Sequence, residues 1–227
     1  MLYVVSTPIG NLDDITLRAL HTLKAVDLVA AEDTRRTHQL LAHFDLHATL
    51  TSYHDFNKEV KAPLIVSRIL EGQSVALVSD AGTPLISDPG YVLVNRCIEA
   101  GIRVIPIPGP SVLTAALAAS GLPTHVFHFE GFLPRRPGRL ARRLEELESH
   151  PGTVVLFESP HRVMKTLMAI RAGWGNRRVV IARELTKIHE EFLRGSLDDV
   201  LAVLKLRVLR GEVTLLVEGK ESHTSRR

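Results

Sequence analysis

The segment from Ala76 to Gly90 carries the most informative set of residues that could do chemistry. Before it, a short apolar run from Val75 to Val78 predicts a buried strand, which ends at the Asp80 carboxylate and a turn-forming Ala-Gly-Thr-Pro. Open α/β sheets bind ligands at the carboxyl ends of their strands, and glycine lets a backbone approach a ligand closely. This segment therefore predicts both an architecture and a ligand site.

Three further loops that follow predicted strands share this composition. They are Thr-Pro-Ile-Gly-Asn at 7–11, Pro-Gly-Pro-Ser at 108–111 and Glu-Ser-Pro-His-Arg at 158–162. If the strands are parallel, all four loops lie along one edge of the sheet. Each loop alone is an ordinary strand–helix connection. Together they favour a continuous pocket.

The common nucleotide fingerprints are missing. No Gly-x-Gly-x-x-Gly follows the first strand, and no Gly-x-x-x-x-Gly-Lys-Ser/Thr occurs anywhere. This argues against a nicotinamide enzyme and a P-loop nucleotidase. The 11 histidines are scattered, so no metal site is expected.

Polar side chains at strand ends in the second half are candidates for acid, base or RNA-positioning roles. An ion-pair network that closes a domain interface is an equally good interpretation. The catalytic candidates are Glu158, His161, Arg183 and Lys187.

A group of arginines begins in a Pro/Gly loop of the second half. Guanidinium groups bind phosphate oxygens in a bidentate manner, so the group could grip an RNA backbone. The alternative is a salt-bridged helix face that uses Glu145, Glu146 and Glu148. Arg35 and Arg36 could add a second RNA contact or simply begin a surface helix. The group comprises Arg135, Arg136, Arg139, Arg142 and Arg143.

Charge is unevenly distributed along the 227 residues. Residues 1–120 hold 9 Lys/Arg against 12 Asp/Glu, whereas residues 121–227 hold 19 against 13. The basic second half either faces a polyanion or presents a solvated arginine-rich surface. The single Cys97 excludes an internal disulfide, and the absence of a basic leader or a bilayer-spanning apolar run predicts a cytoplasmic protein with no membrane association.

Strand and helix patterns alternate along the chain, which predicts a mainly parallel sheet with helices on both faces. The pattern restarts after Gly121-Leu122-Pro123. We expect an N-terminal α/β domain at 1–121, a C-terminal α/β domain at 122–220 and a disordered tail at 221–227. The expected strands are 2–6, 27–31, 50–53, 75–78, 103–107, 126–129, 153–157, 179–183 and 213–218.

Eight sequence blocks in a fixed order resemble the tetrapyrrole methylase superfamily. Within it, they resemble the branch that methylates RNA of the small ribosomal subunit. The resemblance runs from Leu2 to about Gly219. The blocks lie at 7–16, 30–35, 52–54, 79–90, 106–111, 130–134, 158–162 and 182–187.

The resemblance implies an S-adenosylmethionine-dependent enzyme that methylates a cytidine ribose 2′-hydroxyl in the decoding region of 16S rRNA. It also implies a homodimer of two stacked α/β domains, the class III methyltransferase fold, with the cofactor in the interdomain cleft. The superfamily's cofactor contacts map onto Ile9, Asp80, Thr83, Ser111, Val112, Leu156 and Phe157, and more loosely onto Val213 or Thr214.

In the implied reaction, the ribose oxygen attacks a methyl carbon on a sulfonium, so alignment of the two reactants should supply much of the catalysis. A nearby base or positive group would help a poor alcohol nucleophile. Two alternatives remain: a same-fold methyltransferase that acts on a tetrapyrrole or other small acceptor, and a non-catalytic ribosome-binding module. The basic second half favours RNA, and the intact Asp80, Gly82 and Ser111 favour catalysis.

Overall fold

The computed structural model describes residues 1–220, and the expected disordered tail at 221–227 lies outside them. The chain divides into two compact units, Met1–Ser111 and the residues from Val112 onward. Each unit holds one five-stranded sheet, so the expected α/β class with two α/β units is confirmed. Among residues 1–220, no helix is long and apolar enough to cross a membrane.

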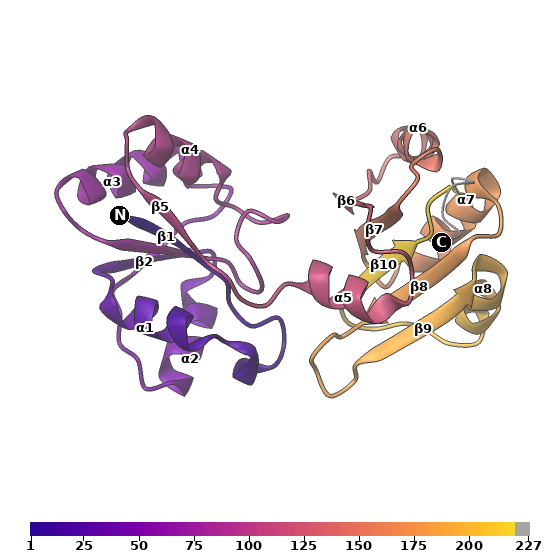
Figure 1. Cartoon of the computed structure of the whole chain (residues 1–227), viewed down its shortest axis with the longest axis horizontal. Coiled ribbons are helices and arrows are strands. Elements are labelled where there is room, and N and C mark those ends of the chain that lie inside the picture. Colours follow the sequence, from indigo (N-terminus) through magenta and orange to yellow (C-terminus); the bar gives the residue numbers. More distant parts are fainter. Residues whose placement is uncertain (221–227) are drawn as a thin grey trace. The chain divides into compact units, whose positions relative to one another are not determined.

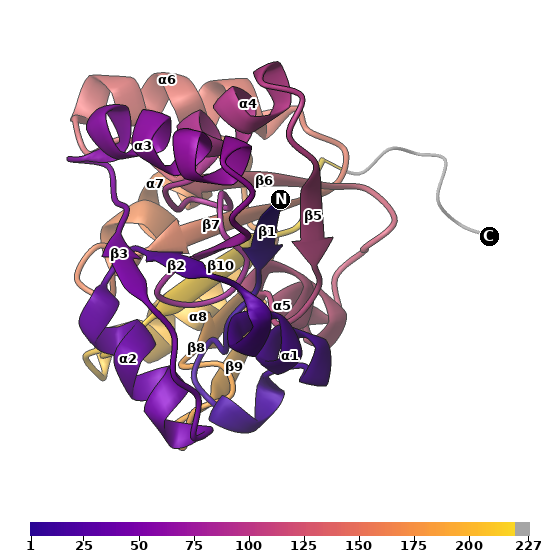
Figure 2. The same ribbon diagram turned by 90° about the vertical axis from the view of Figure 1, so that its left-hand side faces the viewer.

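The first unit is built on a fully parallel sheet with the strand order β3-β2-β4-β1-β5 (Figure 2). β2 and β4 are buried along their whole length, which explains their uninterrupted apolar sequences. The strands are β1 (Leu2–Val5), β2 (Leu28–Ala31), β3 (Leu50–Ser52), β4 (Val75–Val78) and β5 (Val104–Ile107). The helices are a 3-10 turn (Leu12–Asp14), α1 (Leu17–Ala25), α2 (Thr34–His43), α3 (Lys58–Leu70) and α4 (Tyr91–Glu99).

Helices cover both faces of this sheet, as the alternating pattern predicts (Figure 1). On one face, α3 and α4 pack Ile65 and Leu93 against Leu77 of β4. On the other face, α1 and α2 contribute Leu23 and Leu41 to a second apolar cluster. Strand β4 therefore lies between two apolar layers, and this fixes the position at which its carboxyl end emerges.

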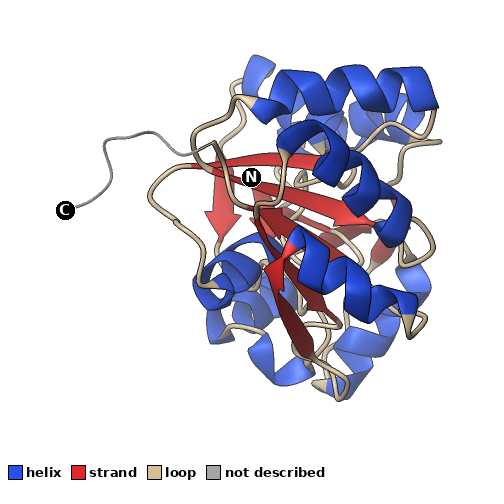
Figure 3. Ribbon diagram, turned by 90° about the vertical axis from the view of Figure 1, so that its right-hand side faces the viewer, coloured by secondary structure: helices blue, strands red, loops and turns tan. Residues whose placement is uncertain are grey.

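The second unit has a mixed sheet with the order β6-β7-β10-β8-β9. Only the β6–β7 pair is parallel, so the expectation of mainly parallel strands is wrong for this half. Figure 3 views the protein from the side of this unit, with helices in front of strands. The strands are β6 (Phe127–Phe132), β7 (Thr153–Glu158), β8 (Arg178–Arg183), β9 (Glu191–Ser196) and β10 (Val213–Val217). The helices are α5 (Val112–Ser120), α6 (Pro137–Glu148), α7 (Val163–Trp174) and α8 (Leu197–Lys205).

Strand β9 is missing from the expected set, and its presence explains the mixed topology. It pairs antiparallel with β8 from Arg178↔Ser196 to Arg183↔Glu191. As an edge strand it keeps a half-exposed, charged sequence that contains a glycine, and such a sequence has no clear strand pattern. Because a hairpin-like return replaces a helical crossover here, the parallel arrangement cannot continue.

The boundary between the units differs from the one expected after Gly121. Helix α5 lies against β10 and β8, so it groups with the second sheet. Arg194 of β9 strengthens this grouping, because its guanidinium donates to the carbonyls of Ser120 and Ala119 at 3.2 and 2.6 Å. The restart of the pattern at 121–123 therefore marks the end of α5.

The loop between β4 and α4 holds an unusual backbone. Leu85 and Ser87 have φ values of 74° and 66°, in the left-handed region that costs energy for residues with a Cβ. Gly90 closes this loop with a φ of 149°. A Cβ there would lie 2.7 Å from Leu85 Cδ1 and 3.0 Å from Leu77 Cδ2. The loop thus folds back tightly onto the buried end of β4.

We expect Gly90→Ala to lower the free energy of unfolding by about 2–4 kcal/mol, because it adds a steric clash to an unfavourable φ. Gly101, at the other end of α4, also has a positive φ, but a Cβ there meets nothing within 4 Å. The control Gly101→Ala should therefore cost only about 1 kcal/mol. Urea denaturation of both variants makes the comparison, and equal midpoints would contradict this account.

Candidate functional site

Three loops of the first unit are joined at the carboxyl edge of its sheet. The backbones of Thr7 and Gly82 exchange two hydrogen bonds of 2.9 Å, which join the loops after β1 and β4. The hydroxyls of Ser6 and Thr83 are hydrogen-bonded at 3.0 Å. Thr83 also donates to the carbonyl of Pro110 at 3.4 Å, which adds the loop after β5. The three loops that the sequence assigned to one edge are therefore in contact.

Glycines make this close approach feasible. A Cβ on Gly109 would lie 3.0 Å from Ser6 Cβ, and one on Gly82 would lie 3.4 Å from Ile9 Cγ2. Gly82 also has a φ of 76°. Glycine at these two positions thus allows the loops to approach one another closely.

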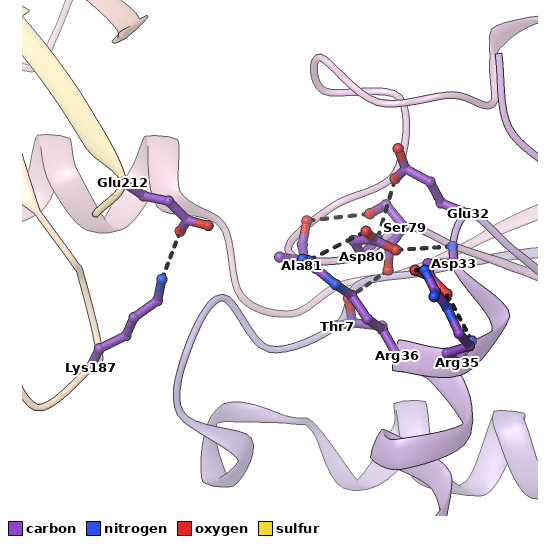
Figure 4. A network of polar contacts seen from close by, with 10 residues as sticks. All are labelled: Thr7, Glu32, Asp33, Arg35, Arg36, Ser79, Asp80, Ala81, Lys187 and Glu212. Atoms are coloured by element: carbon purple, nitrogen blue, oxygen red, sulfur yellow. Dashed lines mark hydrogen bonds and ion pairs between the residues drawn. The ribbon is translucent and has the colours of Figure 1, made fainter. Parts of the chain in front are cut away.

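Asp80 lies at the centre of a polar network at the same edge (Figure 4). Its carboxylate accepts a hydrogen bond from the backbone N–H of Asp33 at 3.0 Å and pairs with the Arg36 guanidinium at 3.3 Å. Its own N–H donates to the Glu32 carboxylate at 3.4 Å. The Asp80 side chain is 28% exposed, so it remains accessible to a ligand.

Two further carboxyl groups near Asp80, those of Glu32 and Asp88, have raised pKa values, mainly because they are partly buried. Burial, together with repulsion from Asp80, raises the pKa of Glu32. Burial also raises the pKa of Asp88 to about 6, against a hydrogen bond from Ser79, and the charges of Glu32 and Asp80 add to the increase. A cation bound here would relieve this repulsion.

A cavity of about 200 Å³ opens beside Asp80. Its lining combines the apolar residues Pro8, Leu12 and Leu40 with the polar residues Thr7, Arg36, Thr37, Gln39 and Ser79. The mixture suits an organic ligand that carries both apolar and hydroxyl groups.

The predicted cofactor contacts fall into two groups. Ile9, Asp80 and Thr83 lie together in the first unit, and Ser111 is that unit's last residue. Val112 begins α5 of the second unit, where Phe157 and Thr214 are neighbours in the β7–β10 register. The side chain of Leu156 is fully buried in the core of the second unit, so only its backbone can meet a ligand.

The loop at 158–162 does not lie along the edge shared by the other three. It follows β7, which belongs to the second sheet. The Glu158 carboxylate is buried and accepts hydrogen bonds from Ser159 N–H at 2.7 Å and from the Thr166 hydroxyl at 2.6 Å. Arg162 lies 3.5 Å from this carboxylate and donates to the carbonyl of Pro134 at 3.3 Å. Glu158 therefore fastens the start of α7, whereas His161 is exposed.

Lys187 and Arg183 belong to ion-pair networks in the second unit. Lys187 pairs with Glu212 at 3.0 Å (Figure 4). It also pairs with Glu184 at 3.1 Å. Burial opposes the charge of Lys187, but the two carboxylates outweigh it and raise its pKa. Arg183 pairs with Glu191 at 3.1 Å. Both side chains are thus held as cations, which favours an electrostatic role over a general base.

The arginines proposed for RNA differ in their partners. Arg35 and Arg36 pair with Asp33 and Asp80, and Arg142 and Arg143 pair with Glu146. The salt-bridged helix face therefore describes Arg142 and Arg143, and Arg35 and Arg36 lie at the start of the surface helix α2. Within residues 1–220, no ion pair or side-chain hydrogen bond holds the exposed guanidinium groups of Arg135, Arg136 and Arg139.

Sequence reasoning missed Ser6, Glu32 and Asp88 as members of the site. Ser6 ends the first expected strand, and Glu32 follows the second expected strand directly. The rule that polar residues at the carboxyl ends of parallel strands meet would have found both residues. The position of Asp88 near the site results from the folded-back loop between β4 and α4, and the sequence contains no comparable signal for that loop conformation.

The comparisons with known proteins agree with this fold. Residues 1–201 match the model of the family described as Tetrapyrrole (Corrin/Porphyrin) Methylases, and the chain belongs to this family. A solved structure of the uroporphyrin-III C-methyl transferase of Thermus thermophilus, complexed with S-adenyl homocysteine, has the same fold. Its TM-score is 0.64 at 20% identity, and the match covers 96% of this chain and 97% of that one.

Similar curated proteins carry a more particular name, Ribosomal RNA small subunit methyltransferase I. The one from Halalkalibacterium halodurans is 51% identical over 218 residues, which is 96% of this chain and 75% of the relative. The one from Thermotoga maritima is 48% identical over 220 residues, which is 97% of this chain and 99% of the relative. The resemblance seen in the sequence blocks is thereby confirmed.

We expect Asp88→Asn to stabilise the protein above pH 6, by roughly 1–2 kcal/mol. In the native state Asp88 titrates near 6, above its unfolded value, so its ionisation weakens folding as pH rises from about 4 to 6. The variant cannot ionise and escapes this loss. Urea denaturation between pH 4 and 8 tests the prediction, and parallel profiles for the two proteins would contradict it.

Proposed function

We propose that this protein transfers the methyl group of S-adenosylmethionine to a cytidine ribose 2′-hydroxyl in the decoding region of 16S rRNA. The observation that carries the proposal is the junction of three loops around Asp80 and Thr83 at the carboxyl edge of the first sheet. Family membership and the name shared by the curated relatives support methyl transfer to RNA of the small ribosomal subunit, and the resemblance of the sequence blocks supports the cytidine ribose as the acceptor.

The residues at this edge fit the proposed cofactor. S-adenosylmethionine carries a sulfonium, an ammonium and ribose hydroxyls, and the three neighbouring carboxyl groups of Asp80, Glu32 and Asp88 would attract its positive charges. Asp80 would accept from a polar group of the cofactor, and the backbones near Ile9, Thr83 and Ser111 would bind the rest. When bound, the cofactor supplies an electrophilic methyl group and leaves as a neutral thioether.

The chain's own contribution would be alignment and charge stabilisation. We propose Lys187 and Arg183 as the positive groups that stabilise the developing ribose alkoxide, because their carboxylate partners hold them as cations. Glu158 is buried and hydrogen-bonded, so we assign it to positioning the start of α7. His161 remains the exposed candidate for a base.

A labelling experiment tests the reaction directly. Small ribosomal subunits that lack the modification are incubated with the protein and cofactor carrying a tritiated methyl group, and the label is mapped. We expect label on the ribose of one cytidine of 16S rRNA. Label only on an added tetrapyrrole would establish the small-acceptor alternative, and subunit binding without label would establish the non-catalytic one.

Substitution of Asp80 by Asn should weaken S-adenosylmethionine binding about 10- to 100-fold, because a charge-assisted hydrogen bond is replaced by a neutral one. The amide oxygen can still accept from Asp33 N–H, so the fold should survive. Isothermal titration calorimetry measures the affinity. Asp45→Asn is the matched control, since Asp45 is exposed and Asn tolerates its φ of 52°. Wild-type affinity in the Asp80 variant would refute its role.

We further propose that the protein acts in the cytoplasm as a homodimer. Val60 and Leu64 lie one turn apart on α3 and are 70% and 57% exposed, and the nearby Phe56 is 99% exposed. Such an apolar stripe suits a protein interface.

Sedimentation velocity tests the homodimer. We expect Val60→Asp combined with Leu64→Asp to convert the dimer to a monomer, because charges would be buried without partners. The control Leu206→Asp changes a leucine of the second unit that is 89% exposed, and it should leave the dimer intact. Persistence of the dimer in the double variant would exclude this surface.

A further inference from the structure

An aromatic stripe lies along the edge of the second sheet. Strand β6 is the edge strand and pairs with β7 in the register Phe127↔Thr153, Phe129↔Val155 and Phe132↔Phe157. The Phe129 and Phe132 rings both contact the Phe157 ring, at centroid distances of 4.9 and 5.6 Å. Phe127 and Phe132 are 43% and 62% exposed.

A bulge places these rings on one face. Phe129 and Phe132 are three residues apart, so a regular strand would point them to opposite faces. The register shifts between Phe129 and Gly131, and Gly131 has a φ of 70°. The extra residue, Glu130, restores Phe132 to the face of Phe129.

The bulge also removes a negative charge from the aromatic face. The Glu130 carboxylate accepts two hydrogen bonds from Arg143 of α6, at 2.6 and 2.5 Å, and a third contact from His128 at 2.9 Å. The Arg143 hydrogen bonds are the main reason that the pKa of Glu130 is lowered. The negative charge of Glu130 is therefore compensated by Arg143 on the side of the strand that faces α6.

Unpaired positive charge follows the stripe directly. Arg135 and Arg136 are exposed three and four positions after Phe132, and Arg139 lies on the first turn of α6. Arg162 fixes this loop through the carbonyls of Leu133 and Pro134, at 3.5 and 3.3 Å. Arg162 thus anchors the loop that carries Arg135 and Arg136, and this loop directly follows strand β6 and its rings.

Exposed rings flanked by unpaired arginines match the chemistry of single-stranded nucleic acid. Bases stack on aromatic faces whatever their hydrogen-bonding edges, while guanidinium groups contact phosphates. Bases inside a duplex cannot reach such rings, so the stripe fits splayed or unpaired nucleotides.

We propose that Phe132, supported by Phe129 and Phe157, stacks an unpaired base of the RNA substrate, with Arg135, Arg136 and Arg139 on the adjoining phosphates. This inference rests on the proposed function, and it specifies how the protein holds the RNA strand that carries the methyl acceptor. An unpaired target segment follows from it, because a ribose that must reach a cofactor is best presented from a strand free of its helix.

The test measures binding of a short unstructured oligoribonucleotide of adenine and cytosine by fluorescence anisotropy across a salt series. Phe132→Leu should weaken binding roughly five- to 100-fold without changing the salt dependence, since no charge is lost. Phe132→Trp should restore binding. Its fluorescence should be quenched by the RNA, because Trp174 is buried and remains a constant background.

The arginines should behave in the opposite way. Replacing Arg135, Arg136 and Arg139 by Gln should flatten the slope of log K against log salt by about 2. Arg142→Gln is the matched control, because Glu146 already pairs with that arginine. Tyr91→Leu is the aromatic control, an exposed ring on the first unit that should not affect RNA binding.

Three outcomes would overturn the proposal. Unchanged oligonucleotide affinity in Phe132→Leu, with methylation of small subunits intact, would exclude the stacking platform and leave the proposed function standing. An altered sedimentation coefficient of that variant with normal RNA binding would make the stripe a protein interface. Lost S-adenosylmethionine affinity would make it part of the cofactor site. Absence of methylation by the wild-type protein would instead refute the proposed function.

Discussion

Two backbone hydrogen bonds between Thr7 and Gly82 are the contact on which the site of the first unit depends. They connect the ends of β1 and β4, which are neighbours in the sheet, and so fix the loop that bears Asp80 and Thr83 relative to the one that bears Ile9. Backbone atoms make this junction, so the side chains around it matter mainly because small ones let the loops approach each other closely. That is why glycine at 82 and 109 and short hydroxyl side chains at 6, 7 and 83 surround it.

The first unit was largely predictable from its sequence. Buried parallel strands give continuous apolar runs, and a polar residue directly after such a run must emerge at the carboxyl edge. Asp80 was found in this way and Glu32 obeys the same rule, whereas Thr83 was assigned from the family resemblance. The second unit was less predictable because β9 is a half-exposed edge strand whose pairing reverses the direction of the sheet. The sequence block around Glu158 was interpreted as a source of catalytic candidates, yet the Glu158 carboxylate is hydrogen-bonded to Ser159 and Thr166 and lies 3.5 Å from Arg162.

Charge in the two units is managed in opposite ways. In the first unit, the carboxyl groups of Glu32 and Asp88 lie near Asp80, and burial, with a smaller contribution from mutual repulsion, raises their pKa values. In the second unit, carboxylates such as Glu130 and Glu146 form ion pairs with arginines. Among residues 1–220, the unpaired positive charge of the arginine group is therefore concentrated on Arg135, Arg136 and Arg139. Counting charged residues in the sequence shows that this half has an excess of positive charge. Only the ion pairs in the structure show which arginines are left without a carboxylate partner in the described part of the chain.

The bulge at Glu130 makes the number of residues in β6 as important as their types. Successive side chains along a strand point to opposite faces of the sheet. Removing one residue between Phe129 and Phe132 would therefore turn the Phe132 ring to the opposite face, toward α6. The same change would separate Glu130 from Arg143, an ion pair that joins β6 to α6. Substitutions in this stretch can therefore be absorbed one at a time, whereas insertions and deletions would disturb the surface and the packing together. Length is the property of this strand that evolution can least easily alter.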